Sequence, residues 1–152
     1  MSPGVPLSVD EQIVRMKAAW PTFAVHNVNR PDQSARWVGT CTPQFARYRL
    51  EARYSLREFP RVRILSPALI RLPANIEGQL PHVYPPADDP TLCLFDPSTE
   101  QCDWSMPIAD TIMPWSFDWL ACYEFWLMTG TWTGGGRHAG DRIEPTQPRD
   151  QL

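Results

Sequence analysis

Hydrophobic residues recur with a helical period near the start of the chain. Four apolar residues follow one another at spacings of four, three and four, which places them on one helical face: Val9, Ile13, Met16 and Trp20. Ser8 and Glu11 have the spacing of an N-terminal capping box, and Pro21 cannot continue a helix. The pattern therefore predicts an amphipathic helix over residues 8–20.

The following segments alternate with a period of two, which is typical of strands. Strands are predicted at residues 23–29, 35–42, 48–56 and 61–65, with a polar turn between the first two. The third is the clearest, because apolar residues occupy every second position: Tyr48, Leu50, Ala52, Tyr54 and Leu56. Polar residues, three of them charged, stand between them, so one face is expected to be buried and the other exposed to solvent. These elements predict an α+β domain with a four-stranded antiparallel meander flanked by helices.

The pattern changes over residues 66–107. Prolines recur throughout this stretch and exclude a regular helix or a central strand through most of it. A loop of this length inside a compact domain is generally either disordered or functional. Large apolar residues are spread along it, including Leu80, Leu92, Phe95 and Trp104, so an ordered, functional loop is the better interpretation.

A second helix is predicted over residues 115–128. Ser116 is a candidate N-terminal cap, and Gly130 supplies the C-terminal stop. Aromatic residues recur with a plain helical period, which favours core packing over a cofactor-binding cluster: Trp115, Trp119, Tyr123 and Trp126. After residue 138 the chain becomes polar and contains prolines, so we expect one domain at 1–138 and a flexible tail at 139–152.

Composition narrows the functional classes. The chain has 152 residues, 43% hydrophobic residues and seven Trp, which suits one folded domain. Its net charge of -3 gives no support for nucleic-acid binding. The N-terminal residues lack a signal-peptide pattern, and the apolar stretch 108–128 is interrupted by charges and Pro114, so neither export nor a membrane span is expected. The four cysteines are therefore expected to be reduced thiols in a cytoplasmic protein.

Three short motifs lie in order within the proline-rich segment. His82-Val83-Tyr84 stands about ten residues before Leu92-Cys93-Leu94, and Trp104-Ser105-Met106-Pro107 follows about ten residues after it. This order resembles the His-Pro-Asn, Cys-Leu and Trp-Ser-Pro motifs of ubiquitin-conjugating enzymes. A longer run, over about residues 60–138, resembles the stand-alone bacterial conjugating-enzyme-like proteins that are encoded with cGAS-like nucleotidyltransferases in CBASS anti-phage operons.

The resemblance implies a ubiquitin-conjugating-enzyme fold and a thioester on Cys93. A cysteine suits such a carrier because it is nucleophilic and its thiolate also leaves well. Cys93 is expected to be solvent-accessible at the rim of a shallow groove, whereas Cys41 and Cys122 are expected in the core. The alternative is that Cys93 is itself a buried structural cysteine. Cys102 is nearer to the motifs than Cys41 and Cys122 but lacks the flanking pattern.

Neighbouring side chains are assigned supporting roles. His82 either orients the loop or moves a proton near Cys93, and the resembling family favours loop support. Tyr84 replaces the family's Asn, so its hydroxyl either stabilises an oxyanion or simply caps the loop. Asp96 is either an acceptor-steering group or a solvated turn residue, and Trp104 is expected to form a wall behind the loop.

Two further readings stay open. His82, Cys93 and Cys102 could supply zinc ligands, but no compact Cys/His pair is present, and the expected site holds no metal or other cofactor. Six arginines form a basic strip that is either solvated or docks an acidic partner: Arg47, Arg49, Arg53, Arg57, Arg61 and Arg63.

Two functions follow from the resemblance. In the first, the chain forms a thioester with the C-terminus of a cGAS-like nucleotidyltransferase and transfers or primes it in anti-phage defence. A separate activating enzyme is then a candidate second partner. In the second, the chain is an inactive binding module of the same fold that only recognises the nucleotidyltransferase.

Overall fold

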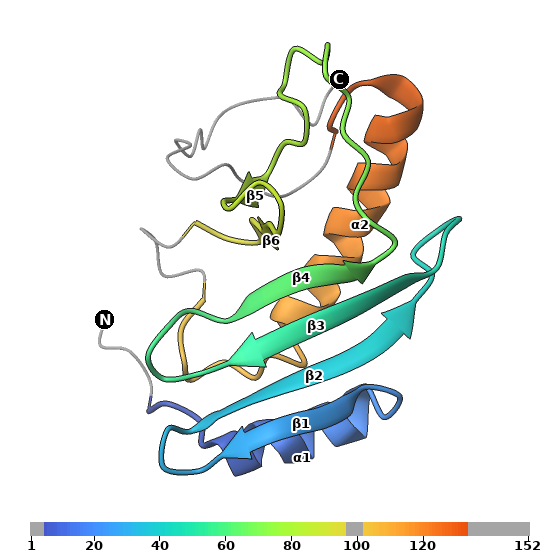
Figure 1. The fold of residues 1–152 in the computed structure, drawn as a ribbon. Coiled ribbons are helices and arrows are strands. Elements are labelled where there is room, and N and C mark those ends of the chain that lie inside the picture. Colours follow the sequence, from blue (N-terminus) through green and yellow to red (C-terminus); the bar gives the residue numbers. More distant parts are fainter. Residues whose placement is uncertain (1–4, 97–101, 134–152) are drawn as a thin grey trace, which may run out of the picture.

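The computed structural model describes residues 5–96 and 102–133 (Figure 1). The elements follow in the order α1 (Val9–Ala19), β1 (Ala24–Asn29), β2 (Ser34–Cys41), β3 (Tyr48–Tyr54), β4 (Arg61–Ser66), β5 (Val83–Tyr84), β6 (Thr91–Leu92) and α2 (Ile112–Thr129). The first four strands form one antiparallel sheet in chain order, and β5 pairs with β6 in a separate hairpin. The α+β prediction is confirmed, whereas the predicted tail at 139–152 lies outside the described residues.

Helix α1 begins where its capping box predicts. The Ser8 hydroxyl accepts a bond from the Glu11 amide, and the Glu11 carboxylate accepts one from the Ser8 amide. On the buried side, the Gln12 amide group donates to the Met106 carbonyl and accepts from the Ile108 amide. Gln12 therefore ties α1 to the segment that leads into α2, a link that the apolar periodicity did not predict.

The alternation predicted for β3 is confirmed. Tyr48, Leu50, Ala52 and Tyr54 are all buried, at 4% exposure or less, whereas Leu56 lies beyond the strand and is 40% exposed. Glu51 departs from the expected wet face, since it is only 2% exposed. Two arginines enclose its carboxylate, because Arg36 Nη1 lies 2.9 Å and Arg63 Nε 2.8 Å from its oxygens. Pairing of this kind is what makes a buried charge tolerable.

Helix α2 begins at Ile112, three residues before the predicted start. Pro114 is compatible with this start, because the first-turn amides of a helix have no intrahelical partner. The prediction of Ser116 as a cap is therefore wrong: it is fully buried inside the helix, and its hydroxyl donates to the Ile112 carbonyl. Gly130 ends the helix as predicted, in the left-handed conformation with φ 77°.

A buried carboxylate joins α2 to the β2–β3 turn. Glu124 is 4% exposed and accepts bonds from the amides of Phe45 (3.1 Å) and Ala46 (2.8 Å) and from the Tyr48 hydroxyl (3.0 Å). Burial, followed by this bond to Glu124, raises the pKa of the Tyr48 phenol. The contact fixes the C-terminal half of α2 on the sheet.

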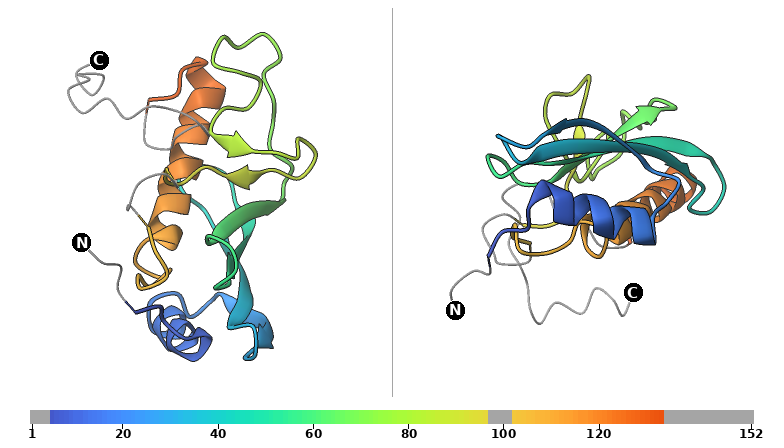
Figure 2. Two further views of the ribbon diagram at one scale, coloured as in Figure 1. Left: turned by 90° about the vertical axis from the view of Figure 1, so that its left-hand side faces the viewer. Right: turned by 90° about the horizontal axis from the view of Figure 1, so that it is seen from below.

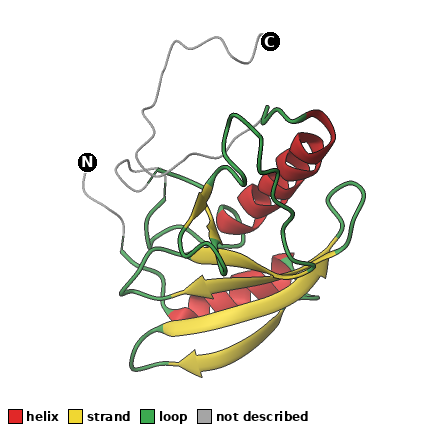
Figure 3. Ribbon diagram, turned by 45° about the horizontal axis from the view of Figure 1, so that its top comes forward, coloured by secondary structure: helices red, strands yellow, loops and turns green. Residues whose placement is uncertain are grey.

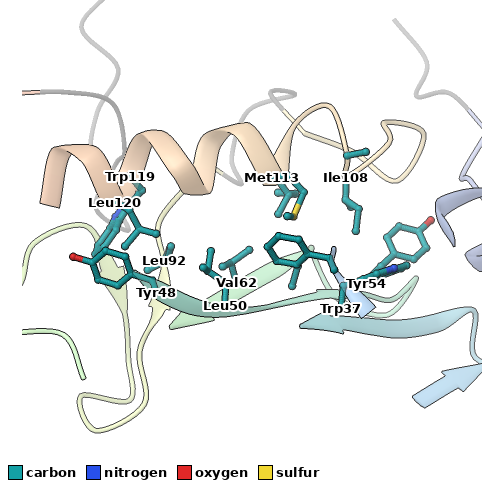
Figure 4. Packing of buried hydrophobic residues seen from close by; sticks show 14 of the residues in the cluster. Trp37, Tyr48, Leu50, Tyr54, Val62, Leu92, Ile108, Met113, Trp119 and Leu120 are labelled. Carbon is teal, nitrogen blue, oxygen red and sulfur yellow. The ribbon is translucent and has the colours of Figure 1, made fainter. Parts of the chain in front are cut away.

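Both helices lie on the same face of the four-stranded sheet, as the view from below shows (Figure 2). The core fills the space between α2 and the sheet (Figure 4). Leu50 and Val62 of the sheet and Leu120 of α2 are each at most 1% exposed. Burying side chains of this size contributes about 1.5–3 kcal/mol each. No helix within the described residues is long and apolar enough to cross a membrane.

Candidate functional site

The hairpin β5–β6 brings the first two sequence motifs together. Val83 pairs with Leu92 and Tyr84 with Thr91, so His82 stands opposite Cys93. The Cys93 amide donates to the His82 carbonyl at 2.9 Å. The expectation that His82 and Tyr84 lie near Cys93 therefore agrees with the backbone pairing.

The backbone at His82 is held in an uncommon conformation. Its φ is 60°, in the left-handed region, which costs free energy for a residue with a side chain and persists only where neighbours hold it. One such neighbour is Trp119 of α2, whose indole N–H donates to the same His82 carbonyl at 2.9 Å. The hairpin accordingly lies beside α2 (Figure 3).

The imidazole of His82 packs against aromatic rings. Its ring centre lies 4.8 Å from that of Trp132, which in turn lies 5.1 Å from that of Trp119. These contacts are those of a residue that supports the loop. The helical period predicts only that Trp119 packs in the core. That Trp119 and Trp132 also position His82 was missed, because nothing in the sequence states which carbonyl an indole N–H will meet.

Cys93 is fully buried, with 0% exposure, so the expectation of a solvent-accessible thiol is wrong. The cause is local. Cys93 follows directly on β6, whose Leu92 is 4% exposed, and the paired strand with its Trp119 contact holds this segment against α2. A reactant can reach the Cys93 sulfur only after the hairpin or its surroundings move.

Tyr84 and Asp96 flank the segment after Cys93. The Tyr84 hydroxyl donates a long bond, 3.5 Å, to the Phe95 carbonyl. This contact ties the two arms of the loop together, as the capping interpretation of Tyr84 predicts. Asp96 is half-buried and ends this described stretch.

Trp104 contacts the loop indirectly, through the ring of Phe59. Its indole N–H donates to the Ser55 carbonyl at 2.7 Å, and its ring stacks on Phe59 with centres 4.9 Å apart. Phe59 makes an edge contact with Phe95 at 5.5 Å. Trp104 was predicted to form a wall behind the loop. Its contact with the loop segment at Phe95 is indirect and passes through the ring of Phe59. No sequence pattern marks Phe59, because it lies in the turn between β3 and β4.

Of the other three cysteines, Cys102 is buried like Cys93, and Cys41 and Cys122 are not. Cys41 and Cys122 are half-buried at the margin of the core rather than inside it, whereas Cys102 is 3% exposed. Burial, with a smaller contribution from Glu124, raises the pKa of Cys41 to about 11. Burial, with a smaller contribution from Asp103, raises that of Cys102 to about 11. Both are protonated near neutral pH, and a protonated thiol is a poor nucleophile.

Metal ligation receives no support from the geometry. Within residues 5–96 and 102–133, no three His, Cys, Asp or Glu side chains are grouped closely enough to hold a metal ion. The zinc interpretation of His82, Cys93 and Cys102 is therefore not supported.

Comparison with known proteins identifies the family. No curated protein matches the chain. The family described as "Type II CBASS E2 protein" matches residues 12–139, which is most of the sequence. The matched range includes the β5–β6 hairpin with its His82 and Cys93 motifs, the Trp104 motif and α2. The chain therefore belongs to the family of type II CBASS E2 proteins.

Proposed function

We propose that the chain has the ubiquitin-conjugating-enzyme fold and carries the C-terminus of a cGAS-like nucleotidyltransferase as a thioester on Cys93. The family supports a conjugating role. The order of helix, four-stranded meander, long loop with a short hairpin, and helix supports the fold. The observation that carries the proposal is the backbone pairing of Cys93 with His82, which joins the two loop motifs in space.

The chemistry requires an activated acyl group at the partner's C-terminus. The Cys93 thiolate attacks the acyl carbon, the sulfur–carbon bond forms, and the activating group departs with the electron pair of its former bond. An amine then attacks the thioester, loses a proton, and releases the thiolate. In this scheme His82 orients the loop through its backbone carbonyl. The Tyr84 hydroxyl, once released from the Phe95 carbonyl by opening of the hairpin, is the candidate donor to the developing oxyanion.

Burial sets a condition on this reaction. The Cys93 sulfur must be uncovered before it can attack, so reaction is coupled to an opening of the hairpin region. The partner that delivers the acyl group is the natural source of that opening, because a ligand that binds the open form better shifts the population toward it.

The test uses the intact protein expressed with its nucleotidyltransferase and operon neighbours. Intact mass measured without reductant should show an adduct equal to the sum of the two chains less one water, and thiol reductant should remove it. Cys93→Ala should abolish the adduct. Cys102→Ala is the matched control, since it also removes a buried thiol, and it should leave the adduct in place. Persistence of the adduct in folded Cys93→Ala protein would reject the assignment.

Full burial of Cys93 is also the observation that favours the second candidate, an inactive binding module. In that case the co-purified complex carries no reductant-sensitive adduct. The Cys93→Ala chain then retains the nucleotidyltransferase with unchanged affinity. Detection of the thioester in the wild-type complex excludes this candidate.

A further inference from the structure

Three arginines stand in one row across the sheet. The strand register pairs Arg36 of β2 with Arg53 of β3, and Arg53 with Arg61 of β4. Directly paired residues of antiparallel strands point to the same face. The adjacent pair Trp37 and Ala52 is buried on the helix side, so the row lies on the opposite, outer face, which faces the viewer in Figure 1.

Like charges directly opposite one another weaken a sheet. Two of the three arginines have local counter-charges: Arg36 pairs with Glu51, and Arg61 with Glu58, each at 2.9 Å. The Arg53 guanidinium has no hydrogen bond or ion pair to any residue in the described part of the chain. Arg53, the central arginine of a mutually repelling row, is thus available to pair with a ligand at the surface. Departures from local stability rules of this kind concentrate at functional positions.

The row lines the margin of a hollow of about 540 Å³. Besides the three arginines, the walls carry neutral polar side chains, including Asn29 and Ser55, and the ring of Phe59. Glu58 is the single acidic residue among the lining residues in the described part of the chain, and its side chain is 57% exposed. An exposed ion pair such as Arg61–Glu58 contributes little to stability, so Glu58 can yield its place to another carboxylate.

The spacing of the row suits an extended acidic peptide. Paired Cα atoms of neighbouring strands are about 4.5–5.5 Å apart, so the row extends over about 10 Å. Acidic side chains two residues apart on an extended chain share one face and lie about 7 Å from each other. Two such carboxylates fit within the row. A nucleic acid is a poorer match, because the whole chain carries a net charge of -3 and would repel a long polyanion.

We infer that the hollow beside Arg36, Arg53 and Arg61 docks an acidic, extended segment of a partner protein. This goes beyond the proposed thioester, because it assigns a non-covalent recognition surface on the face of the sheet away from the helices. Arg53 supplies the primary contact, as its guanidinium is not otherwise engaged within the described residues. Arg61 supplies a second contact when Glu58 swings away.

The probe is a fluorescein-labelled peptide in which Asp or Glu alternates with Ser, and binding to the full chain is followed by anisotropy. The acidic peptide should bind, and binding should weaken as salt is added. A peptide with Asn and Gln in place of the acids should not bind. Arg53→Gln should weaken binding about tenfold, the size expected for one charge-assisted contact. Its Tm should not fall, because the substitution removes repulsion within the row.

Arg49→Gln is the matched control. Arg49 lies on the same strand and face as Arg53, is exposed, and pairs with Thr40 and Ser66 instead of arginines. It should change the affinity by less than about twofold, as expected for a screened charge outside the site. Absence of acidic-peptide binding, equal losses in both variants, or tighter binding of a single-stranded DNA with the same number of charges would each overturn the inference.

Discussion

The bond from Trp119 to His82 offers a direct test of what keeps Cys93 buried. Trp119→Phe keeps an aromatic ring in the core but removes the N–H donor, which lies 2.9 Å from the His82 carbonyl. The carbonyl retains its bond from the Cys93 amide. We therefore expect the hairpin to open more often, with Cys93 exposed in the open form.

The free-energy cost of Trp119→Phe has two parts, the lost hydrogen bond and the lost ring volume. One neutral hydrogen bond contributes about 1 kcal/mol, and the partner carbonyl is not left wholly unsatisfied. Smaller ring volume costs a further amount, about 1–3 kcal/mol, which also lowers global stability. Trp126→Phe is the matched control. Trp126 is a fully buried tryptophan of the same helix, and its indole nitrogen has no hydrogen-bond partner in the described part of the chain. The difference between the variants is thus about 1 kcal/mol, or about fivefold in the opening equilibrium.

Native-state alkylation read by peptide mass spectrometry measures this difference. With dilute reagent, the labelling rate of a buried thiol follows the population of the open form. Cys93 in Trp119→Phe should be labelled about fivefold faster than in Trp126→Phe. Cys102 is also buried but lies outside the hairpin, so its rate should be similar in the two variants. Equal Cys93 rates in the two variants would refute the role assigned to the indole bond.

Three further predictions concern the framework around the site. Glu124→Ala should destabilise the fold by about 3 kcal/mol in urea unfolding, because it leaves two amides and the Tyr48 hydroxyl without their acceptor, and a loss below about 1 kcal/mol would contradict this. Gly39→Ala should cost about 1–3 kcal/mol, since the added Cβ would lie 2.6 Å from the Phe23 ring, and an unchanged Tm would reject that clash. Cys41 alkylation should rise through pH 9–11 without levelling at pH 9, because burial raises the pKa of this thiol from 9.0 to about 11; a plateau near pH 9 would contradict the shift.

The sheet could be predicted from sequence because its signal is local and repeated. Alternation in β3 identifies both the strand and its buried face, and the prolines and polar turns delimit its neighbours. The alternation does not predict that Glu51 is buried. Its burial depends on Arg36 from one neighbouring strand and Arg63 from the other, and a period-two pattern does not contain that information. The start of α2 was missed for a related reason, because Pro114 is tolerated only in a first turn.

The sequence predicted that His82 lies near Cys93, which agrees with their backbone bond, but it did not predict that Cys93 is buried. The expected proximity rested on the order of the loop motifs and on the family resemblance. Strands β5 and β6 have two residues each, too few to show any periodicity. Their register, and hence the placement of Cys93 beneath the surface, rests on contacts with α2 such as the Trp119 bond. A motif can identify a reactive residue, but only tertiary packing decides how far it is from solvent.

The burial of Cys93 constrains both candidate functions in opposite ways. A binding module gains from a closed hairpin, because a rigid loop loses little entropy when a partner docks. A thioester carrier must spend part of its partner's binding energy on opening, since only the open fraction reacts. Among the contacts that hold the closed form, the His82 carbonyl accepts from one indole and one amide, and its backbone is held in a strained conformation at φ 60°. Release of that strain offsets part of the free energy needed to uncover the Cys93 thiol. The thioester proposal therefore requires the partner to supply the remainder through tighter binding to the open form, whereas the binding-module proposal requires no opening at all.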